Sequence, residues 1–317
     1  MNDRVRHVIS TYGTALAGLA LFVFLLIFAR NFAAPANLLN VLKHASFLAI
    51  LGAGFAFALL AAELDLSFAA LCSLAAIVTG GLVHGGTAWE LAALAGLAVG
   101  LAGGVLNGLL VTKAKVPSLI ATLGSASVAN GLAFMATGGV AFVGRWDPAF
   151  LSLARGSILG VPALALFMAA AVALGWLVSK RTRLGAHMLA TGEAEEAARR
   201  AGIATARMKR TGLAISGAAA GVAAVLLTAN LSSAAPQMAG DYLLNAIAAV
   251  LLGMTMFEPG RPNILGAFVG ALVLAMLSNG LVLLGAPYYL QDIMLGAILI
   301  ASVSVSASAL KKAAFTV

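Results

Sequence analysis

The chain is poor in charge, cysteine and aromatic residues. Only 9% of its 317 residues are charged, whereas a soluble protein carries about 25%. Its single cysteine, Cys72, excludes an internal disulfide. The sequence also has no Gly-x-x-x-x-Gly-Lys-Ser/Thr loop, no Gly-x-Ser-x-Gly elbow and no paired Cys/His spacing. It therefore predicts no enzyme, no metal site and no cofactor bound by this chain itself.

Hydrophobic residues, by contrast, make up 62% of the chain, and the mean hydropathy is +1.04. Apolar runs long enough to cross a bilayer recur along the whole length. Lipid admits only helices or closed barrels, and continuously apolar runs select helices. We therefore predict an all-α integral membrane protein whose residues 1–317 form one transmembrane permease domain. About ten spans are expected, at residues 11–29, 44–62, 66–84, 90–112, 118–138, 157–179, 212–232, 243–257, 263–285 and 290–309.

Basic residues orient these spans. With both termini cytoplasmic, 15 of the 19 Lys and Arg residues fall on the cytoplasmic side. Only Arg30, Lys43, Arg145 and Arg155 fall outside. This split follows the positive-inside rule, so N- and C-termini are predicted in the cytoplasm. The net charge of +8 then reflects topology and contact with anionic lipid, and nucleic acid is not an expected partner.

One short link is ambiguous. Residues 61–67 connect two apolar runs and contain Glu63 and Asp65. The link is either a tight cytoplasmic turn or a break within the membrane whose polar groups face the protein interior. These two carboxylates are the only acidic groups expected inside the membrane, so ion-driven transport has little support.

Two patterns concern packing and symmetry. Gly96, Gly100, Gly104 and Gly108 share one helix face and predict close backbone packing, either within a subunit or between subunits. An Asn-Gly pair precedes a proline twice, at 107–117 and again at 279–287. In the predicted topology these copies run in opposite directions, which is the pattern of an inverted repeat in a transporter.

Residues 180–210 form the one long polar interruption, predicted to be a cytoplasmic loop. Eight basic residues surround Glu193, Glu195 and Glu196 there. Glu193–Ile203 is predicted as one short amphipathic helix with Glu195–Arg199 and Glu196–Arg200 pairs, ended by Gly202. Such a helix either fits a groove in a soluble motor or is a solvated surface helix.

Five sets of short motifs follow one another along almost the whole chain. They are residues 63–67 (ELDLS); 120–125 with 130–132 and 137–139; 181–185 with 190–192, 196–199 and 202–203; 245–250 with 253, 255, 260–261 and 265–266; and 279–281. With these motifs the chain resembles the permease subunit of bacterial ABC importers for monosaccharides, of the ribose/xylose/arabinose/galactose type. It departs from the family pattern at Ala62-Glu63, where Gly-Gly is usual, and in the proline-bounded turn 258–262.

The resemblance implies the transmembrane subunit of an ATP-driven importer in the bacterial cytoplasmic (inner) membrane. The solute would be a monosaccharide or a similar polyhydroxylated molecule, delivered by an extracytoplasmic binding protein. A partner ABC ATPase, often two fused domains, would bind ATP and Mg. A second permease, identical or paralogous, would complete the path. The turn 258–262 leaves homodimer and heterodimer open.

The resemblance also implies site residues. Glu196, Ala197, Ala198 and Gly202 would form the ATPase coupling helix, within a segment that includes Glu193, Glu195 and Arg199. Asp65 and Ser67 would lie near the path. From residue chemistry we add uncharged hydrogen-bonding side chains as candidate path residues, namely Asn107, Thr122, Ser125, Asn130, Asn245 and Asn279. Ordinary interhelical hydrogen bonds are the alternative for each of them.

Three loop charges, Arg145, Asp147 and Arg155, are candidate contacts for the binding protein. They are equally well explained as solvated loop charges. Three other functions stay open at this point. The same scaffold carries nucleoside or autoinducer-type solutes in related permeases. An ion-coupled secondary transporter and a membrane scaffold subunit are the others.

Overall fold

Helices make up nearly all of the protein. The structure, a computed structural model, describes residues 3–144 and 146–315. Within these ranges it has thirteen helices and four two-residue strands. In chain order they are α1 (Asp3–Phe28), α2 (Pro35–Leu60), α3 (Phe68–His84), α4 (Trp89–Thr112), α5 (Ser118–Thr137), β1 (Phe142–Val143), α6 (Pro148–Arg155), β2 (Ser157–Ile158), β3 (Val161–Pro162), α7 (Ala163–Arg181), α8 (Arg183–Glu193), α9 (Glu195–Arg200), α10 (Thr205–Leu231), β4 (Ser233–Ala234), α11 (Tyr242–Gly253), α12 (Ile264–Leu283) and α13 (Tyr289–Phe315).

Among the described residues, six helices are long and apolar enough to cross a membrane: α2, α4, α5, α7, α10 and α12. Shorter apolar helical stretches lie at Thr14–Phe28, Phe68–His84, Tyr242–Gly253 and Tyr289–Ser304. The prediction of a helical protein with many apolar spans is confirmed at this level.

The predicted span 157–179 began too early. Residues 157–162 form an antiparallel hairpin in which Ser157 pairs with Pro162 and Ile158 with Val161. Leu159 (φ 52°) and Gly160 (φ 80°) make its turn, and two positive φ angles are what a tight two-residue hairpin requires. Because Ile158, Leu159 and Val161 are apolar, the hairpin extends the hydrophobic run and hides the true start of α7.

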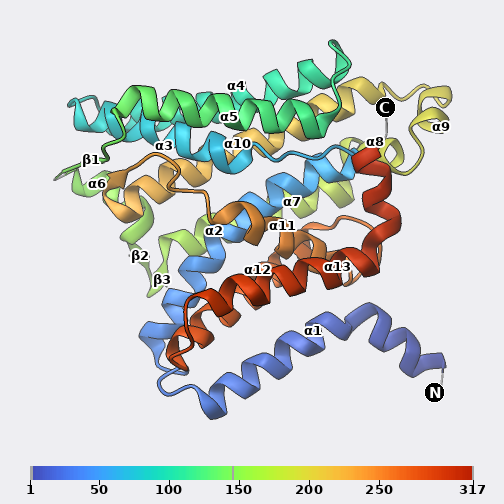
Figure 1. The fold of residues 1–317 in the computed structure, drawn as a ribbon, viewed down its shortest axis with the longest axis horizontal. Coiled ribbons are helices and arrows are strands. Elements are labelled where there is room, and N and C mark those ends of the chain that lie inside the picture. Colours follow the sequence, from blue (N-terminus) through green and yellow to red (C-terminus); the bar gives the residue numbers. More distant parts are fainter. Residues whose placement is uncertain (1–2, 145, 316–317) are drawn as a thin grey trace.

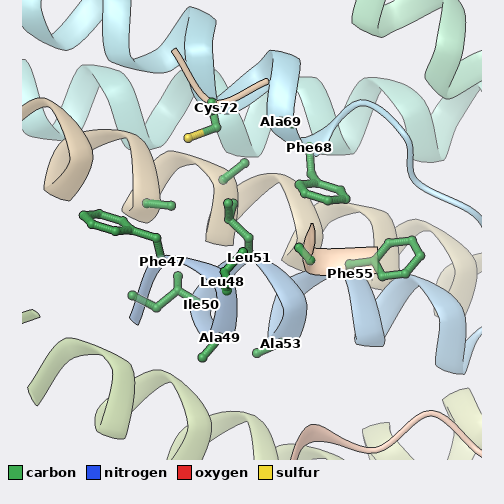
Figure 2. Packing of buried hydrophobic residues seen from close by; sticks show 14 of the residues in the cluster. Phe47, Leu48, Ala49, Ile50, Leu51, Ala53, Phe55, Phe68, Ala69 and Cys72 are labelled. Carbon is green, nitrogen blue, oxygen red and sulfur yellow. The ribbon is translucent and has the colours of Figure 1, made fainter. Parts of the chain in front are cut away.

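The core is built around α2. Every residue from Ala45 to Leu60 is buried, so this helix is apolar on all sides and is enclosed by other helices. Its neighbours are α7, α10, α11 and α12. Figure 2 shows Phe47, Leu51 and Phe55 of α2 in this core, with Phe68 and Cys72 of α3 nearby.

The glycines that share one face of α4 pack against another helix of the same chain, α10. A Cβ on Gly100 or Gly104 would lie under 3.0 Å from backbone atoms of α10, closer than real Cβ atoms come. Gly217 of α10 faces Gly100 and Gly104 in the same way. The structure therefore supports the intrasubunit interpretation of this pattern.

The two ends of the helical body differ. In Figure 1, α8 and α9 lie at the end where α1 begins and α13 finishes, and we call this the α9 end. The hairpin β2–β3, helix α6 and strand β1 lie at the opposite end, here the α6 end. Strand β1 pairs antiparallel with β4 there, with Phe142 opposite Ala234.

Candidate functional site

The link between α2 and α3, residues 63–67, has no regular secondary structure, and its three polar side chains are buried. Glu63 is 4% exposed, and Asp65 and Ser67 are fully buried. Two of its backbone N–H groups bond to α5: Leu64 donates to Ser118 Oγ (3.2 Å) and Leu66 to Thr122 Oγ1 (3.1 Å). Buried backbone polar groups need such partners. The polar groups of this link therefore face the protein interior and not solvent.

Four side chains form one continuous hydrogen-bond chain beside this segment. Ser125 of α5 donates to Asn107 Oδ1 of α4. Asn107 Nδ2 donates to Ser67 Oγ at 2.7 Å. The Ser67 hydroxyl and its N–H (2.9 Å) both donate to Asp65 Oδ1. These hydrogen bonds therefore all donate in one direction, from Ser125 of α5 through Asn107 of α4 to the buried carboxylate of Asp65.

Five candidate path residues thus meet: Asp65, Ser67, Asn107, Thr122 and Ser125. In this conformation they bond to one another or to the adjoining backbone. The other carboxylate oxygen, Asp65 Oδ2, is buried without a hydrogen-bond partner among the described residues.

The remaining candidate path residues lie elsewhere. Asn130 is half-buried on α5. Asn279 of α12 exchanges two amide hydrogen bonds with Asn37 of α2, at 2.9 and 3.0 Å. Asn245 of α11 donates to the Asp241 carbonyl oxygen at 2.7 Å. The structure therefore joins five of the eight candidates and leaves three apart from them.

Asn245 lines a pocket of about 460 Å³ between α2, α11, α12 and α13, which we call the outer pocket. Its polar lining residues are His44, Asp241, Asn245, Ser278, Tyr288, Gln291 and Asp292. Ser278 donates to Gln291 Oε1 at 2.9 Å, which holds α12 against α13. Sequence reasoning identified only Asn245 here. His44, Asp241 and Asp292 are polar residues at the ends of predicted spans. A position at the membrane interface explains such residues equally well, so they did not indicate a pocket.

The predicted helix Glu193–Ile203 is divided in the structure. Ala194 (φ −154°, ψ 81°) separates α8 from α9, so Glu193 ends α8 and Glu195 begins α9. The single-helix prediction was wrong at this residue. The predicted end is correct: Gly202 has φ +84°, its N–H bonds to Arg199 O (3.0 Å), and Ile203 N–H bonds to Ala198 O (3.0 Å). These are the two bonds of a Schellman motif.

The ion pairs of this region also differ from the prediction. Glu196 pairs with both Arg199 and Arg200, and these three side chains are exposed. Glu195 pairs instead with Lys209 of α10, at 2.7 Å, so the predicted Glu195–Arg199 pair is wrong. Ala197 is exposed and Ala198 is buried, which leaves one face of α9 open to solvent.

Two further pairs tie the 180–210 loop to the turn after α11. Glu193 pairs with Arg261 (2.6 Å), and Lys180 pairs with Glu258. Gly192 sits against the carbonyl of Leu60 at the end of α2, where no Cβ would fit. The turn 258–262, where the sequence departs from the family pattern, is therefore held against α7 and α8 of the same chain.

The candidate contacts for a binding protein lie at the α6 end. Arg145 lies outside the described residues. Asp147 caps α6, accepting from Ala149 N–H at 2.8 Å. Arg155 donates twice to the Asn230 carbonyl oxygen of α10, at 2.9 and 2.7 Å. Both described side chains are exposed, and each also has a local structural role.

These features define a class: a multi-pass helical membrane protein with a buried polar network and a short ion-paired helix at one end. A family described as branched-chain amino acid transport system / permease component matches residues 37–303. The chain therefore belongs to this permease family. As a permease component it is the membrane-embedded transport subunit, and the expectation that it is not itself the ATPase is confirmed.

Individual relatives match along most of their length. The ribose import permease protein RbsC of Bacillus subtilis (strain 168) is 34% identical over 289 residues, 90% of each chain. The L-arabinose transport system permease protein AraH of Escherichia coli (strain K12) is 30% identical over 292 residues, 92% of this chain and 89% of that one. The D-allose transport system permease protein AlsC of the same strain is 30% identical over 270 residues, 84% and 82% of the two chains. The resemblance identified from the motifs is confirmed. No solved structure matches significantly.

Proposed function

We propose that this chain is the transmembrane subunit of an ABC importer that admits a monosaccharide or a similar polyhydroxylated solute. The observation that carries the proposal is the match, over about nine-tenths of each chain, to permeases named for ribose and arabinose. The outer pocket and the buried network supply the hydroxyl, amide and carboxylate groups that a polyol needs as hydrogen-bond partners.

The proposed topology has ten spans with the α9 end in the cytoplasm. Among the described residues, six long apolar helices and four shorter apolar stretches support this number of spans. The basic residues of 180–210 gather at the α9 end, in agreement with the positive-inside rule. Asn107 and Asn279 support the inverted repeat, because their amides make equivalent contacts. Asn107 joins α4 to the beginning of α3, and Asn279 joins α12 to the beginning of α2.

In this proposal α9 is the coupling helix that seats in a partner ATPase. Its exposed face carries Glu196, Ala197, Arg199 and Arg200, while buried Ala198 holds its base and exposed Gly202 forms its end. ATP and Mg are bound by the partner. ATP-driven closure of the two ATPase domains moves α9, and the two permeases rock between inward- and outward-open states.

The path is proposed to connect the outer pocket, with Asn245, to the network of Asp65, Ser67, Asn107, Thr122 and Ser125. Asn279 and Asn130 stay candidate path residues in this proposal. An extracytoplasmic binding protein delivers the solute at the α6 end, where Asp147 and Arg155, with Arg145, would contact it. A second permease would cover part of the apolar surface of α5, which exposes Ile120, Val128 and Met135.

Co-purification from native membrane tests the proposal. The wild-type chain is expected to bring a stoichiometric ATPase, and mass spectrometry would show whether a second, different permease is present. Glu196→Lys inverts a charge on the exposed face of α9 and is expected to abolish ATPase retention without reducing membrane insertion. Retention of the ATPase by Glu196→Lys would contradict the placing of the coupling helix. Purification of the wild-type chain alone would contradict the importer.

A further inference from the structure

Lys209 joins two parts of the protein that are far apart in the sequence. Its ammonium lies 2.9 Å from Glu63 Oε1, in the buried segment 63–67, and 2.7 Å from Glu195 Oε2, at the start of α9. We call these three side chains the ion triad. An ammonium has three donors and no acceptor, so it can hold both carboxylates at once.

Burial separates the Lys209–Glu63 pair of the ion triad from the other ion pairs near α9. The side chains of Lys209 and Glu63 are 14% and 5% exposed. Those of Lys180 and Glu258 are 33% and 36% exposed, and Arg199 and Glu196 are more exposed still. Exposed pairs contribute little, whereas removing one member of a buried pair leaves an uncompensated charge. Among the residues that the structure describes, the buried Lys209–Glu63 pair is therefore the strong part of the ion triad, and Glu195, whose side chain is 36% exposed, links that pair to α9.

The two ends of the ion triad are held differently. Beyond Glu63, the segment is fixed to α5 through Ser118 and Thr122 and to α4 through Asn107. Lys209 is carried by α10, which packs backbone against backbone on α4. Glu195, by contrast, stands on a six-residue helix that follows the break at Ala194. Movement is therefore easiest at the α9 side.

A groove of about 1040 Å³ lies beside the ion triad. Residues of α9 form one wall, and Thr112, Lys115 and Ser118 of the α4–α5 connection form another. The groove gives α9 room to move towards or away from α4 and α5. Any such movement must carry Lys209 along or break its contact with Glu195.

We propose that the Glu63–Lys209–Glu195 ion triad transmits displacement of α9 to the buried segment 63–67, with Lys209 as the positioning residue between them. This rests on the proposed function of α9 as the coupling helix. Through Glu63, the triad biases the hydrogen-bond chain that ends on Asp65.

The test uses the complete complex with its ATPase in proteoliposomes, and compares Lys209→Met and Glu63→Gln with wild type. Two quantities are measured: stimulation of ATP hydrolysis by the solute-loaded binding protein, and solute imported per ATP hydrolysed. Both variants are expected to keep unstimulated hydrolysis near the wild-type rate and to lose about five-fold or more of both quantities. Lys209→Arg keeps the charge and is expected to restore most of both.

A double-mutant cycle and a matched control sharpen the result. Glu63→Gln combined with Lys209→Met is expected to be no worse than Lys209→Met alone, because the residues act as one unit. The double variant also leaves no unpaired charge on Glu63, so it decides the question if Lys209→Met does not fold. Lys180→Met, which breaks the exposed pair at the same end, is expected to behave as wild type.

Wild-type stimulation and wild-type solute-to-ATP ratio in both Glu63→Gln and the double variant would overturn the proposal. Equal loss of stimulated and unstimulated hydrolysis, without rescue by Lys209→Arg, would also overturn it and assign the triad a purely structural role. Failure of the proposed function is distinguishable, because the wild-type chain would then retain no ATPase at all.

Discussion

Gly217 of α10 and Gly100 of α4 meet backbone to backbone, and each would place a Cβ under 3.0 Å from the other's carbonyl oxygen. We expect Gly217→Ala to force these helices apart, because backbone cannot yield as a flexible side chain does. Overpacking of this kind costs about 1–3 kcal/mol or more. The measurement is the yield and the thermal unfolding midpoint of the purified protein.

Gly131→Ala is the control for Gly217→Ala. Gly131 lies within α5 with no atom within 4 Å of the added Cβ, and alanine favours a helix over glycine by about 1 kcal/mol. It is expected to match or exceed wild-type stability. If Gly217→Ala were as stable as Gly131→Ala, the close α4–α10 contact would be wrong.

Asn107→Leu removes the centre of the buried hydrogen-bond chain while nearly keeping the side-chain volume. Ser67 loses its donor and Ser125 its acceptor. Leaving such groups unsatisfied is expected to destabilise the protein by about 1–3 kcal/mol, measured by thermal unfolding in detergent. Asn130→Leu, at a half-buried position on α5, should shift the midpoint much less. Equal shifts would argue against the network.

Gly202 lies in open space at the end of α9, so its requirement is conformational rather than steric. Gly202→Val is expected to disrupt the Schellman motif at a cost of about 1–2 kcal/mol and to reduce solute uptake. Gly202→Asn should retain most uptake, because asparagine tolerates a positive φ. Normal uptake by the valine variant would show that the end of α9 is not needed for coupling.

Asp147 is both a helix cap and an exposed charge, and two substitutions separate these roles. Asp147→Ser keeps a capping oxygen and removes the charge, whereas Asp147→Ala removes both and costs about 1 kcal/mol of helix stability. Contact with a binding protein predicts that both variants weaken its association, measured by surface plasmon resonance. If only Asp147→Ala had an effect, the cap alone would explain it.

The outer pocket is tested by Asn245→Leu, which removes a hydrogen-bonding amide from its wall. Loss of one hydrogen bond of about 1 kcal/mol to the solute predicts uptake about five-fold slower at solute concentrations well below saturation. ATPase retention should be unchanged. Leu281→Ile alters the same wall without changing its polarity and should transport normally. Unchanged uptake by Asn245→Leu would remove this pocket from the path.

The helical class followed from the sequence because apolar length and the absence of alternation constrain lipid-embedded backbone so strongly. Helix starts were harder. Ile158 and Val161 continue a hydrophobic run into a hairpin, whose turn is made by the positive φ angles of Leu159 and Gly160. Ala194 breaks the amphipathic helix although alanine is the best helix former. Tertiary packing overrides propensity at both places.

The candidate site was predicted in part for a physical reason. Polar residues within apolar runs must find partners, so Asp65, Ser67, Asn107, Thr122 and Ser125 stood out individually. Their union in one network depends on how α3, α4 and α5 pack. Lys209 was counted only as a cytoplasmic charge, since nothing local in the sequence links it to Glu63.

Uptake by proteoliposomes containing the complete complex tests the central claim most directly. Radiolabelled ribose or arabinose is supplied outside with the binding protein, and ATP is trapped inside or omitted. The importer predicts accumulation only with ATP and the binding protein, independent of sodium or proton gradients. Accumulation driven by an ion gradient in vesicles that lack ATP would contradict it.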